Sequence, residues 1–407
     1  MPDDIQTSCV IAGAGPAGLM LGYLLARAGV DVVVAEKHGD FLRDFRGDTI
    51  HPSTLEVMRE LGLIDEFLQL PHTRAPKLSA EMGGRTVTIA DFSRLPVENR
   101  FIAFMPQWDF LNFLAEKARA YPNFRLVMQA GVIDLIDEAG RISGLVVETA
   151  EGQVRVMSQL VVGADGRNSV VRAKGGLAVE SFGVPSEVLW MKLSKQPGDP
   201  ADVMGHAGPR QGLVLIDRGD YWQCGFVLRK GTYAEILEGG IEPFRQMVSG
   251  ISPFPGDRML EIRSFEDVRL LTVRIDRLTQ WWRPGLLCIG DAAHAMSPIG
   301  GVGVNLAIQD AVAAANILAR PLRDVLLSDR DLAAVERRRS FPTRATQKLQ
   351  LMMRSRRRKG QGAAEKRKGP PAFVRGIARW PVLAHLAGRL IGLGFRMEHV
   401  RTPPAPR

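Results

Sequence analysis

Short apolar runs that end at a glycine or an acid recur along the chain and predict buried strands. They cover residues 8–12, 31–35, 160–163 and 285–290. An Ala/Leu-rich stretch from residue 16 to Gly29 predicts a helix after the first run. Residues 304–319 repeat apolar positions at helical spacing, with an expected end before Pro321. Strands that alternate with helices predict an α/β fold with a parallel, doubly wound sheet.

A second pattern, with a period of two, occupies residues 187–230 and 258–276. Its apolar positions fall on one face of each predicted strand, as in the two sets Trp222, Cys224, Phe226, Leu228 and Leu271, Val273, Ile275. This alternation predicts half-buried strands of one antiparallel sheet. It leaves open whether Trp190, Trp222 and Phe226 line a pocket or belong to the core.

Composition places the chain among well-buried globular proteins and locates its charge. Of 407 residues, 45% are apolar and 24% charged, which suits more than one domain. The net charge of +9 comes from residues 336–407, which hold 19 Lys/Arg against 3 Asp/Glu. The first 335 residues carry 34 basic and 41 acidic groups, a net of −7. The basic character therefore belongs to the C-terminal part alone.

The basic runs at residues 354–359 and 366–368 contain no interleaved aromatic residue that could stack on bases, so no nucleic-acid partner is predicted. Residues 373–383 mix apolar and basic groups in a way that suits a helix lying on a surface. A solvated helical face and a weak peripheral contact with an anionic membrane both remain open.

Cys9, Cys224 and Cys288 each lie in an apolar run, which favours buried, reduced thiols in a cytoplasmic protein and excludes a disulfide framework or a metal site by spacing. The apolar stretch at residues 9–26 lacks a basic segment before it and is not read as a signal peptide. Residues 376–395 are interrupted by charged residues and a proline, and no transmembrane segment is predicted.

The first glycine motif has the order strand, glycine turn, helix, strand and acid, which is typical of a dinucleotide site. Gly13 is expected to make the tight turn, Gly15 to let the backbone approach a pyrophosphate, and Gly18 to let helix and sheet pack closely. Pro16 suits the first turn of a helix whose N-terminus attracts phosphate. Glu36, 23 positions after Gly13, can accept from a ribose hydroxyl. The unit does not distinguish NAD from FAD.

Two later turns complete the candidate site. Asp165-Gly166 follows a buried strand and precedes a helix start capped by Asn168 or Ser169. Gly290-Asp291 follows another strand and leads through glycines into the helix of residues 304–319. Asp291 can accept from a ribityl hydroxyl, while N–H groups around residues 301–304 can face a ring carbonyl that becomes negative. We therefore predict a cradle for a cofactor that itself carries the reactive atoms.

These three motifs, across roughly residues 8–320, resemble those of the single-component (group A) flavoprotein aromatic hydroxylases, the p-hydroxybenzoate hydroxylase-like family. The resemblance implies that Arg46 lies near the FAD phosphates and that Gln107 touches the cofactor. It also implies that the carbonyl of Pro298, the one candidate catalytic residue, lies above the flavin, and that His294 is structural. The candidate cofactor contacts are Gly13, Ala14, Gly15, Pro16, Ala17, Gly18, Glu36, Lys37, Arg46, Gln107, Asp165, Gly290, Asp291, Pro298, Gly301, Val302, Gly303, Val304 and Asn305.

The resemblance implies a Rossmann-like FAD-binding domain with an inserted antiparallel sheet domain and a helical C-terminal segment. The FAD-binding domain is expected at residues 1–75, 100–180 and 277–345, the substrate-binding sheet at 76–99 and 181–276, and the basic helical segment at 346–407. The sheet would roof the substrate pocket above the flavin.

The resemblance also implies a monooxygenase that uses FAD, NADH or NADPH and O2 to hydroxylate an aromatic or phenol/quinone-like small molecule through a flavin C4a-hydroperoxide. A FAD-dependent oxidoreductase of the same fold without oxygen insertion, acting on an isoprenoid or quinone-like substrate, is the alternative. A non-catalytic FAD-bound scaffold is a third hypothesis, and a flavin halogenase is disfavoured because Trp281-Trp282-Arg283-Pro284 does not supply that family's signature. Substrate, nicotinamide preference and oligomeric state stay undetermined.

Overall fold

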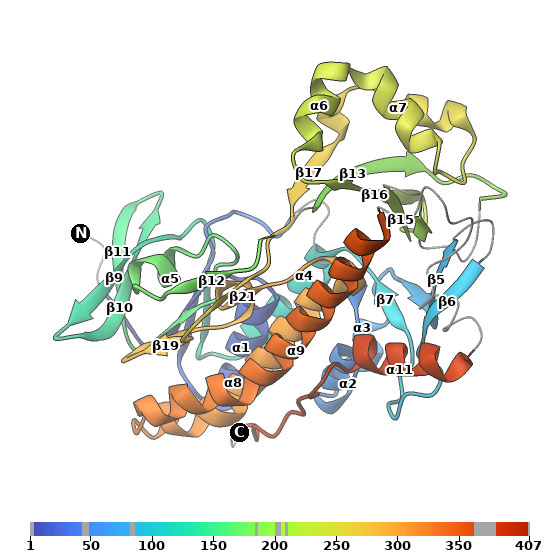
Figure 1. The fold of residues 1–407 in the computed structure, drawn as a ribbon. Helices are drawn as coiled ribbons and strands as arrows, with labels where there is room; N and C mark the ends of the chain where they lie inside the picture. The colour runs from blue at the N-terminus through green and yellow to red at the C-terminus, as the bar shows by residue number, and fades with distance from the viewer. Residues whose placement is uncertain are drawn as a thin grey trace.

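The computed structural model describes residues 4–42, 49–81, 86–183, 186–199, 205–207, 211–361 and 380–405, with side chains outside 353–361. Figure 1 shows a body of sheet and helices, with a second sheet above it that carries α6 and α7 on its outer side. The described helices are α1 (Pro16–Arg27), α2 (Pro52–Glu60), α3 (Ile64–Phe67), α4 (Gln107–Arg119), α5 (Val170–Lys174), α6 (Thr232–Gly239), α7 (Ile241–Ser249), α8 (Val302–Arg323), α9 (Asp329–Gln361) and α11 (Pro381–Gly392). The 3-10 turns are η1 (Gly256–Glu261), η2 (Phe265–Asp267), η3 (Gly290–Ala292) and η4 (Ile299–Gly301).

The central sheet is parallel over most of its width, as the apolar runs predict. Its order is β19 (Trp282–Arg283), β20 (Leu286–Cys288), β11 (Gly152–Gly163), β1 (Ile5–Ala12), β2 (Val32–Ala35) and β8 (Phe124–Val127). β9 (Gly131–Glu138) and β10 (Arg141–Thr149) extend β11 as an antiparallel meander. The α/β, Rossmann-like fold class is confirmed.

The strand order reverses between β1 and β11, and this reversal places a crevice at their carboxyl ends. The chain passes from β1 to β2 on one side, whereas β11 pairs with β1 on the other, with Ala12 opposite Gly163. Ligands of doubly wound sheets bind at such a switch point. The two strands are buried on both faces at their carboxyl halves, where Cys9 and Leu160 are fully buried.

α8 crosses this body and packs against α1, and it is longer than the sequence predicts. The expected end before Pro321 is wrong, because α8 continues to Arg323 with Pro321 in its last turn. Leu318 and Leu322 are fully buried, and packing of this face holds the extra turn although proline removes one helical N–H. Residues 299–323 have the length and composition of a membrane span, but 72% of that apolar window is buried inside the protein.

The second sheet has seven strands, antiparallel except for the pair β14–β5. Its order is β17 (Arg269–Thr272), β13 (Ser186–Ser194), β16 (Tyr221–Arg229), β15 (Gly212–Asp217), β14 (Gly205–Ala207), β5 (Lys77–Glu81) and β6 (Thr86–Asp91). The strand prediction for residues 258–276 is wrong in part, because η1 and η2 occupy 256–261 and 265–267. Val273 and Ile275 are buried outside any strand, and β18 (Asp276–Leu278) pairs with β12 (Val179–Ser181) and β21 (His294–Ala295) instead.

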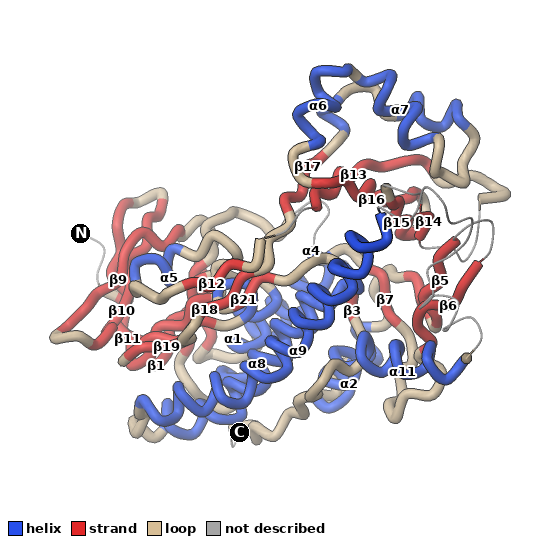
Figure 2. Tube along the Cα trace, viewed as in Figure 1, coloured by secondary structure: helices blue, strands red, loops and turns tan. Residues whose placement is uncertain are grey.

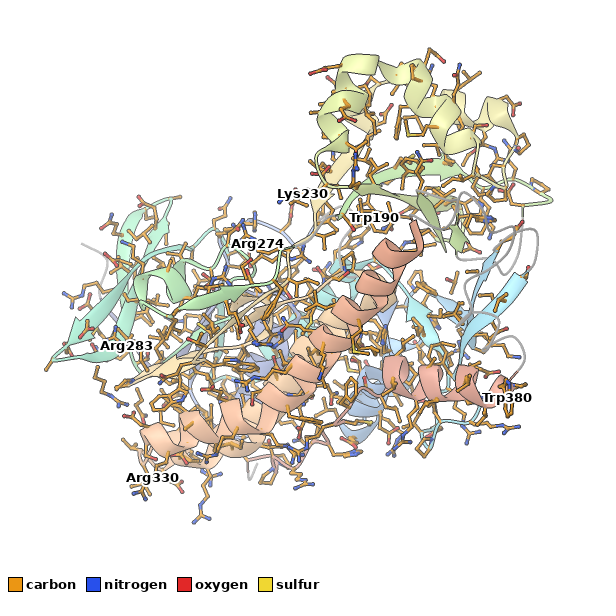
Figure 3. The ribbon with its side chains drawn as sticks, viewed as in Figure 1. Trp190, Lys230, Arg274, Arg283, Arg330 and Trp380 are labelled. Atoms are coloured by element: carbon orange, nitrogen blue, oxygen red, sulfur yellow. The ribbon has the colours of Figure 1, made fainter. Side chains whose placement is uncertain are left out.

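The two faces of the seven-stranded sheet differ in what they contact. Trp222, Cys224 and Phe226 point to the core shared with α6 and α7, as alternation predicts. Trp190 lies on the opposite face, in a cluster that includes Leu351 of α9, and Figure 3 places it on the side of the sheet nearer to α9. Trp222 and Phe226 are thus core residues of the outer layer, and Trp190 belongs to the cluster on the face towards the body. Cys9, Cys224 and Cys288 are free and buried, as expected.

The C-terminal part of the chain joins both sheets. α11 lies on β6, where the absence of side chains at Gly388 and Gly392 permits contact with Asp91 and Phe92. The chain then returns along α8 to α1, and the Ala405 N–H donates to the Arg27 carbonyl at 2.8 Å. Figure 2 shows this last segment as an extended loop beside α8 and α9. Besides β12-β18-β21 there is another three-stranded sheet, in the order β3 (Thr49–Ile50), β7 (Ile102–Phe104) and β4 (Thr73–Ala75), and its β3 contacts α8.

Candidate functional site

The carboxyl ends of four parallel strands carry the predicted site residues. The Gly13 N–H donates to the Ala35 carbonyl at 2.7 Å, and the Ala164 N–H donates to the Ala12 carbonyl at 2.8 Å. The Ile289 N–H donates to Gly163 at 2.9 Å. These bonds bring three turns together, and we call residues 13–18, 164–166 and 290–305 the glycine cradle.

The first turn of the cradle depends on two glycines for its shape. Gly13 has φ +98°, and a Cβ there would lie 2.6 Å from the Ala164 carbonyl oxygen. A Cβ on Gly18 would lie 1.9 Å from the Gly13 carbonyl oxygen. Both positions therefore exclude a side chain for reasons internal to the protein.

Gly15 differs from Gly13 and Gly18 because no protein atom excludes a side chain there. A Cβ on Gly15 would meet nothing within 4 Å, and Gly15 is the extended N-cap of α1, with Pro16 in the first turn. The backbone thus faces open space at the N-terminus of a helix, where unpaired N–H groups and the helix dipole favour an anion. Ala14 and Ala17 are buried beside it.

Glu36, at the end of β2, is tied to the first turn. Its Oε2 accepts from the Ala14 N–H at 2.9 Å, and its Oε1 accepts from the His38 N–H at 3.2 Å. The side chain of Glu36 is 11% exposed, and its Oε1 also lies 2.5 Å from the Nδ1 of His38. Lys37 is exposed beside Gly131.

Asp165 shapes the second turn. Its Oδ2 accepts from the N–H groups of Val170 and Val171 at 2.7 and 3.2 Å, while Ser169 caps α5 by accepting from Arg172 at 2.9 Å. Of the predicted caps, Ser169 is thus the one observed. The Asp165 Oδ1 is buried and has no hydrogen-bond partner within the described chain.

The third turn meets the first one directly. A Cβ on Gly290 would lie 3.1 Å from the Cβ of Ala17 and 3.2 Å from that of Ala307, so Gly290 is the contact point between α1 and α8. Asp291 follows with a side chain that is 30% exposed, and its Oδ2 accepts from the Arg167 Nε at 2.9 Å. Its carboxylate is therefore accessible at the edge of the crevice.

The turn before α8 also uses glycine conformations. Gly300 and Gly301 have φ +78° and +63°, and the Pro298 carbonyl accepts from the Gly301 N–H at 3.0 Å. Gly301 is the N-cap of α8, and Val302, Gly303 and Val304 form its first turn. A Cβ on Gly303 would meet nothing within 4 Å, so a second helix N-terminus faces open space.

Asn305 joins this turn to the segment before α2. Its Oδ1 accepts from the His51 N–H at 2.8 Å and from the Thr54 hydroxyl at 2.7 Å. Its Nδ2 donates to the carbonyls of Thr49 and Gly301 at 3.0 and 3.3 Å. The buried side chain of Asn305 therefore braces the turn before α8 against the segment before α2.

His51, which no pattern in the sequence indicates as a functional residue, lies at the centre of this brace. It is fully buried, and its Nδ1 donates to the Ile391 carbonyl of α11 at 2.8 Å. Burial lowers the pKa of His51 to about 4, although nearby backbone carbonyls act in the opposite direction. The ring is therefore neutral at neutral pH. The one feature of the sequence that could have indicated His51 is its position directly before the helix α2.

His294 is held by a buried carboxylate, which agrees with the structural role that the resemblance implies. Its Nε2 donates to Asp310 Oδ2 at 2.6 Å. Burial alone would raise the pKa of Asp310, but His294 and Arg339 outweigh it and hold this pKa below its usual value. Asp310 was also not predicted as a functional residue, although a carboxylate within the apolar face of a predicted helix can be detected in the sequence.

Two of the predicted cofactor contacts, Gln107 and Arg46, do not belong to the three turns of the cradle. Gln107 is the half-buried first residue of α4 and follows β7, which pairs with β3 through Phe104 and Thr49. Thr49 in turn donates its hydroxyl to the Gly301 carbonyl at 2.9 Å. Arg46 lies outside the described residues.

The cradle fits a flavin dinucleotide in the chemistry of its donors and acceptors. Two helix N-termini face open space at Gly15 and Gly303, the carboxylates of Glu36 and Asp291 can accept from sugar and ribityl hydroxyls, and Asp165 offers an unpartnered oxygen. No group of three metal-ligating side chains occurs among the described residues. The site thus provides binding and orientation, and the bound group provides the redox chemistry.

Comparisons with known proteins identify the family of the chain. A family model described as an FAD binding domain matches residues 6–348. The 6-methylpretetramide 4-monooxygenase of Streptomyces rimosus is 34% identical over 86% of this chain and 84% of its own length. The dialkyldecalin synthase of Streptomyces rugosporus is 25% identical over 76% of this chain and 64% of its own. The crystal structure of a probable FAD-dependent monooxygenase from Pseudomonas aeruginosa has 22% identity and a TM-score of 0.73, covering 89% of this chain and 97% of that one.

Replacement of His51 by Asn tests its burial in the neutral form. A histidine with a folded pKa of about 4, against 6.5 for the unfolded chain, contributes stability above pH 6.5 that is lost as the pH falls towards 4. A shift of this size corresponds to about 3 kcal/mol. We expect the unfolding free energy of the wild type, measured with urea between pH 7 and 4, to fall by about this much more than that of His51→Asn. An equal fall of the unfolding free energy in the wild type and in His51→Asn would contradict the burial of His51 in its neutral form.

Proposed function

The chain belongs to the FAD binding domain family and is a FAD-dependent monooxygenase, and on that premise we propose that the glycine cradle holds FAD so that a flat aromatic substrate is hydroxylated beneath the seven-stranded sheet. NAD(P)H supplies the electrons and O2 the oxygen atom. The observation that carries the placement is the pair of helix N-termini, at Gly15 and Gly303, that face open space at one edge of the central sheet.

Each turn of the cradle has a part in this proposal. The N-terminus of α1, with residues 13–18, binds the pyrophosphate, and Glu36 with Lys37 lies at the ribose. Asp165 and Asp291 accept from hydroxyl groups of the sugar and ribityl chain. Arg46 and Gln107 remain proposed contacts from the resemblance. When bound, FAD supplies the redox chemistry by which O2 is activated.

The N-terminus of α8 stabilises negative charge on the ring. Its unpaired N–H groups at residues 302–304 would face a ring carbonyl placed at the N-terminus of α8. The α8 dipole favours an anion there by about 0.3–1 kcal/mol when exposed and up to ~2 when partly buried. The turn at residues 298–301 fixes these N–H groups before the ring arrives, so little reorganisation accompanies the reaction. We place the carbonyl of Pro298 near the face of the ring that meets oxygen.

The substrate side is assigned to the face of the seven-stranded sheet that turns away from α6 and α7. The side chains on that face are mostly apolar and include Val188, Trp190, Ile216, Val214, Val227 and Leu271. Such a face excludes water and accepts a flat ring system better than a strongly charged molecule. A phenol or quinone-like aromatic compound is therefore the substrate class that we propose, within the domain boundaries expected from the sequence.

One relative favours a second candidate function, a reaction on the same fold without oxygen insertion. The Streptomyces rugosporus protein is named a synthase and not a monooxygenase. A reaction on the same FAD-binding fold without oxygen insertion would need the same cradle, so the fate of the oxygen atom is the property that separates the two functions.

A weak peripheral membrane contact is proposed for the C-terminal part. Trp380, Val382 and Leu386 of the α11 region are 59, 62 and 53% exposed, and Figure 3 shows Trp380 at the outer end of this helix. Residues 354–379, which precede it, contain 10 Lys/Arg and one Glu. Exposed aromatic and aliphatic side chains next to basic ones suit an anionic membrane surface. A cytoplasmic location is proposed from the three unpaired, buried thiols.

Alanine at Gly15 or Gly303 separates cofactor binding from folding. Neither Cβ would touch the protein, so we expect the FAD-free variants to unfold at the wild-type temperature or slightly above. Binding of FAD, measured by quenching of its fluorescence, should weaken by at least about tenfold, equivalent to about 1.4 kcal/mol, because the Cβ occupies the space of the ligand. Gly239→Ala, at the end of α6 with equally open surroundings, is the control. If both cradle variants bound FAD with wild-type affinity, the proposed placement of FAD would be contradicted.

Oxygen labelling separates the two functions. With FAD, NAD(P)H and a panel of phenols and quinones, we expect at least one compound to accelerate NAD(P)H oxidation and to gain one atom of label from ¹⁸O2, detected by mass spectrometry. Products without label, formed by a reaction that proceeds equally without O2, would favour the function without oxygen insertion.

Sedimentation with vesicles tests the membrane contact. The full-length protein should bind vesicles rich in anionic lipid at low salt and dissociate as salt rises, because attraction by basic residues is screened. A variant with Arg356→Glu, Arg357→Glu and Trp380→Ser should bind several-fold less. Equal binding of both proteins, or none by the wild type at low salt, would exclude the contact.

A further inference from the structure

A chain of buried charged groups runs from the third turn of the cradle to the C-terminal end of the protein. It starts at Asp310 of α8, which is fully buried. Its Oδ2 accepts from the Gly290 N–H at 3.1 Å and from the His294 Nε2 at 2.6 Å. Gly290 directly precedes Asp291, the proposed acceptor for the cofactor. The position of Asp310 therefore sets the position of the turn that carries Asp291.

Arg339 of α9 connects Asp310 to the last segment of the chain. Its Nε donates to Asp310 Oδ1 at 2.8 Å, and its Nη1 donates to the Arg396 carbonyl at 3.2 Å and to Glu398 Oε1 at 3.3 Å. Arg339 is fully buried and Glu398 is 3% exposed. Charges at this depth are stable only when every partner is present, so the three side chains act as one unit.

We call residues 396–405 the C-terminal strap. Besides Glu398, the strap is bound at points outside the charged chain. The Val400 N–H donates to Glu60 of α2 at 2.7 Å, and the Arg401 N–H donates to Asn316 of α8 at 2.8 Å. Arg338, on the adjacent position of α9, donates to both oxygens of Glu398 at 2.8 and 3.0 Å. The strap can thus stay attached when its link to Arg339 is weakened.

We propose that the C-terminal strap is a positioning element for FAD, in which Glu398 orients Arg339, Arg339 orients Asp310, and Asp310 fixes the turn at Gly290. This inference rests on the proposed placement of FAD in the cradle. None of the three charged side chains touches the cofactor in this scheme. Because coupling between two sites is reciprocal, FAD must stabilise the docked strap by the same factor by which the docked strap strengthens FAD binding.

The test combines FAD affinity with hydrogen exchange in the full-length protein. In the wild type, FAD should slow amide exchange at residues 396–402. In Glu398→Gln, FAD affinity should fall by at least about fivefold, a typical lower bound for coupled sites, and the protection of the strap by FAD should shrink accordingly. The protection readout is one that a merely structural role for the strap would not move.

Two further variants control for folding and for loss of the strap in general. Arg338→Gln weakens the hold on Glu398 without emptying a fully buried site, so it should lower FAD affinity in the same direction by a smaller factor. Glu60→Gln removes the charge and one of the two acceptor oxygens that hold the strap on α2 but leaves the charged chain intact. It should bind FAD within about twofold of the wild type, well below the typical coupling range.

The outcomes distinguish this inference from the function on which it rests. Wild-type FAD affinity in both Glu398→Gln and Arg338→Gln, or strap exchange that FAD does not change, would overturn the positioning role while FAD binding itself stands. A loss of FAD affinity in Glu60→Gln equal to that in Glu398→Gln would also overturn it. The effect on FAD would then come from any loosening of the strap and not from the charged chain. A wild type that binds no FAD would overturn both proposals.

Discussion

The close contact of three backbone turns at one edge of the central sheet determines the rest of this structure. Gly18 lies against the Gly13 carbonyl, Gly13 lies against Ala164, and Gly290 lies between Ala17 and Ala307. Gly13 and Gly18 have no room for a side chain, and a Cβ on Gly290 would crowd the methyl groups of Ala17 and Ala307. Together these contacts bring the ends of β1, β11 and β20 and the N-termini of α1 and α8 into one crevice. Because the contacts involve backbone atoms and short buried side chains, the crevice is fixed before any ligand enters it.

The groups that the described part of the cradle contributes are those of a binding site. They are two helix N-termini and several carboxylates, which can bind and orient a cofactor, and we propose that the apolar face of the second sheet excludes water. Asn305 of the cradle, and His51 and Asp310 beside it, make their side-chain hydrogen bonds with other parts of the protein. They hold the shape of the site, while the bound FAD carries the redox chemistry.

Local patterns in the sequence predicted the elements that depend on neighbours along the chain. The glycines at 13, 15 and 18, the acid after β2 and the turns at 165 and 290 were placed correctly in the fold because each belongs to a strand, turn and helix read in order. The longer α8, the 3-10 turns at 256–261 and 265–267, and the contacts of Arg339 with Asp310 and Glu398 were not predicted. These depend on packing between segments far apart in the sequence, which leave no periodic signal.

A crystal structure of the protein with FAD is the most direct test of the cradle. The account predicts that the pyrophosphate lies against the backbone at Gly15 and that the isoalloxazine ring meets the first turn of α8 at Gly303, below the face of the sheet that carries Trp190. A flavin ring bound away from the α8 N-terminus, or a nucleotide bound outside the crevice between β1 and β11, would contradict it.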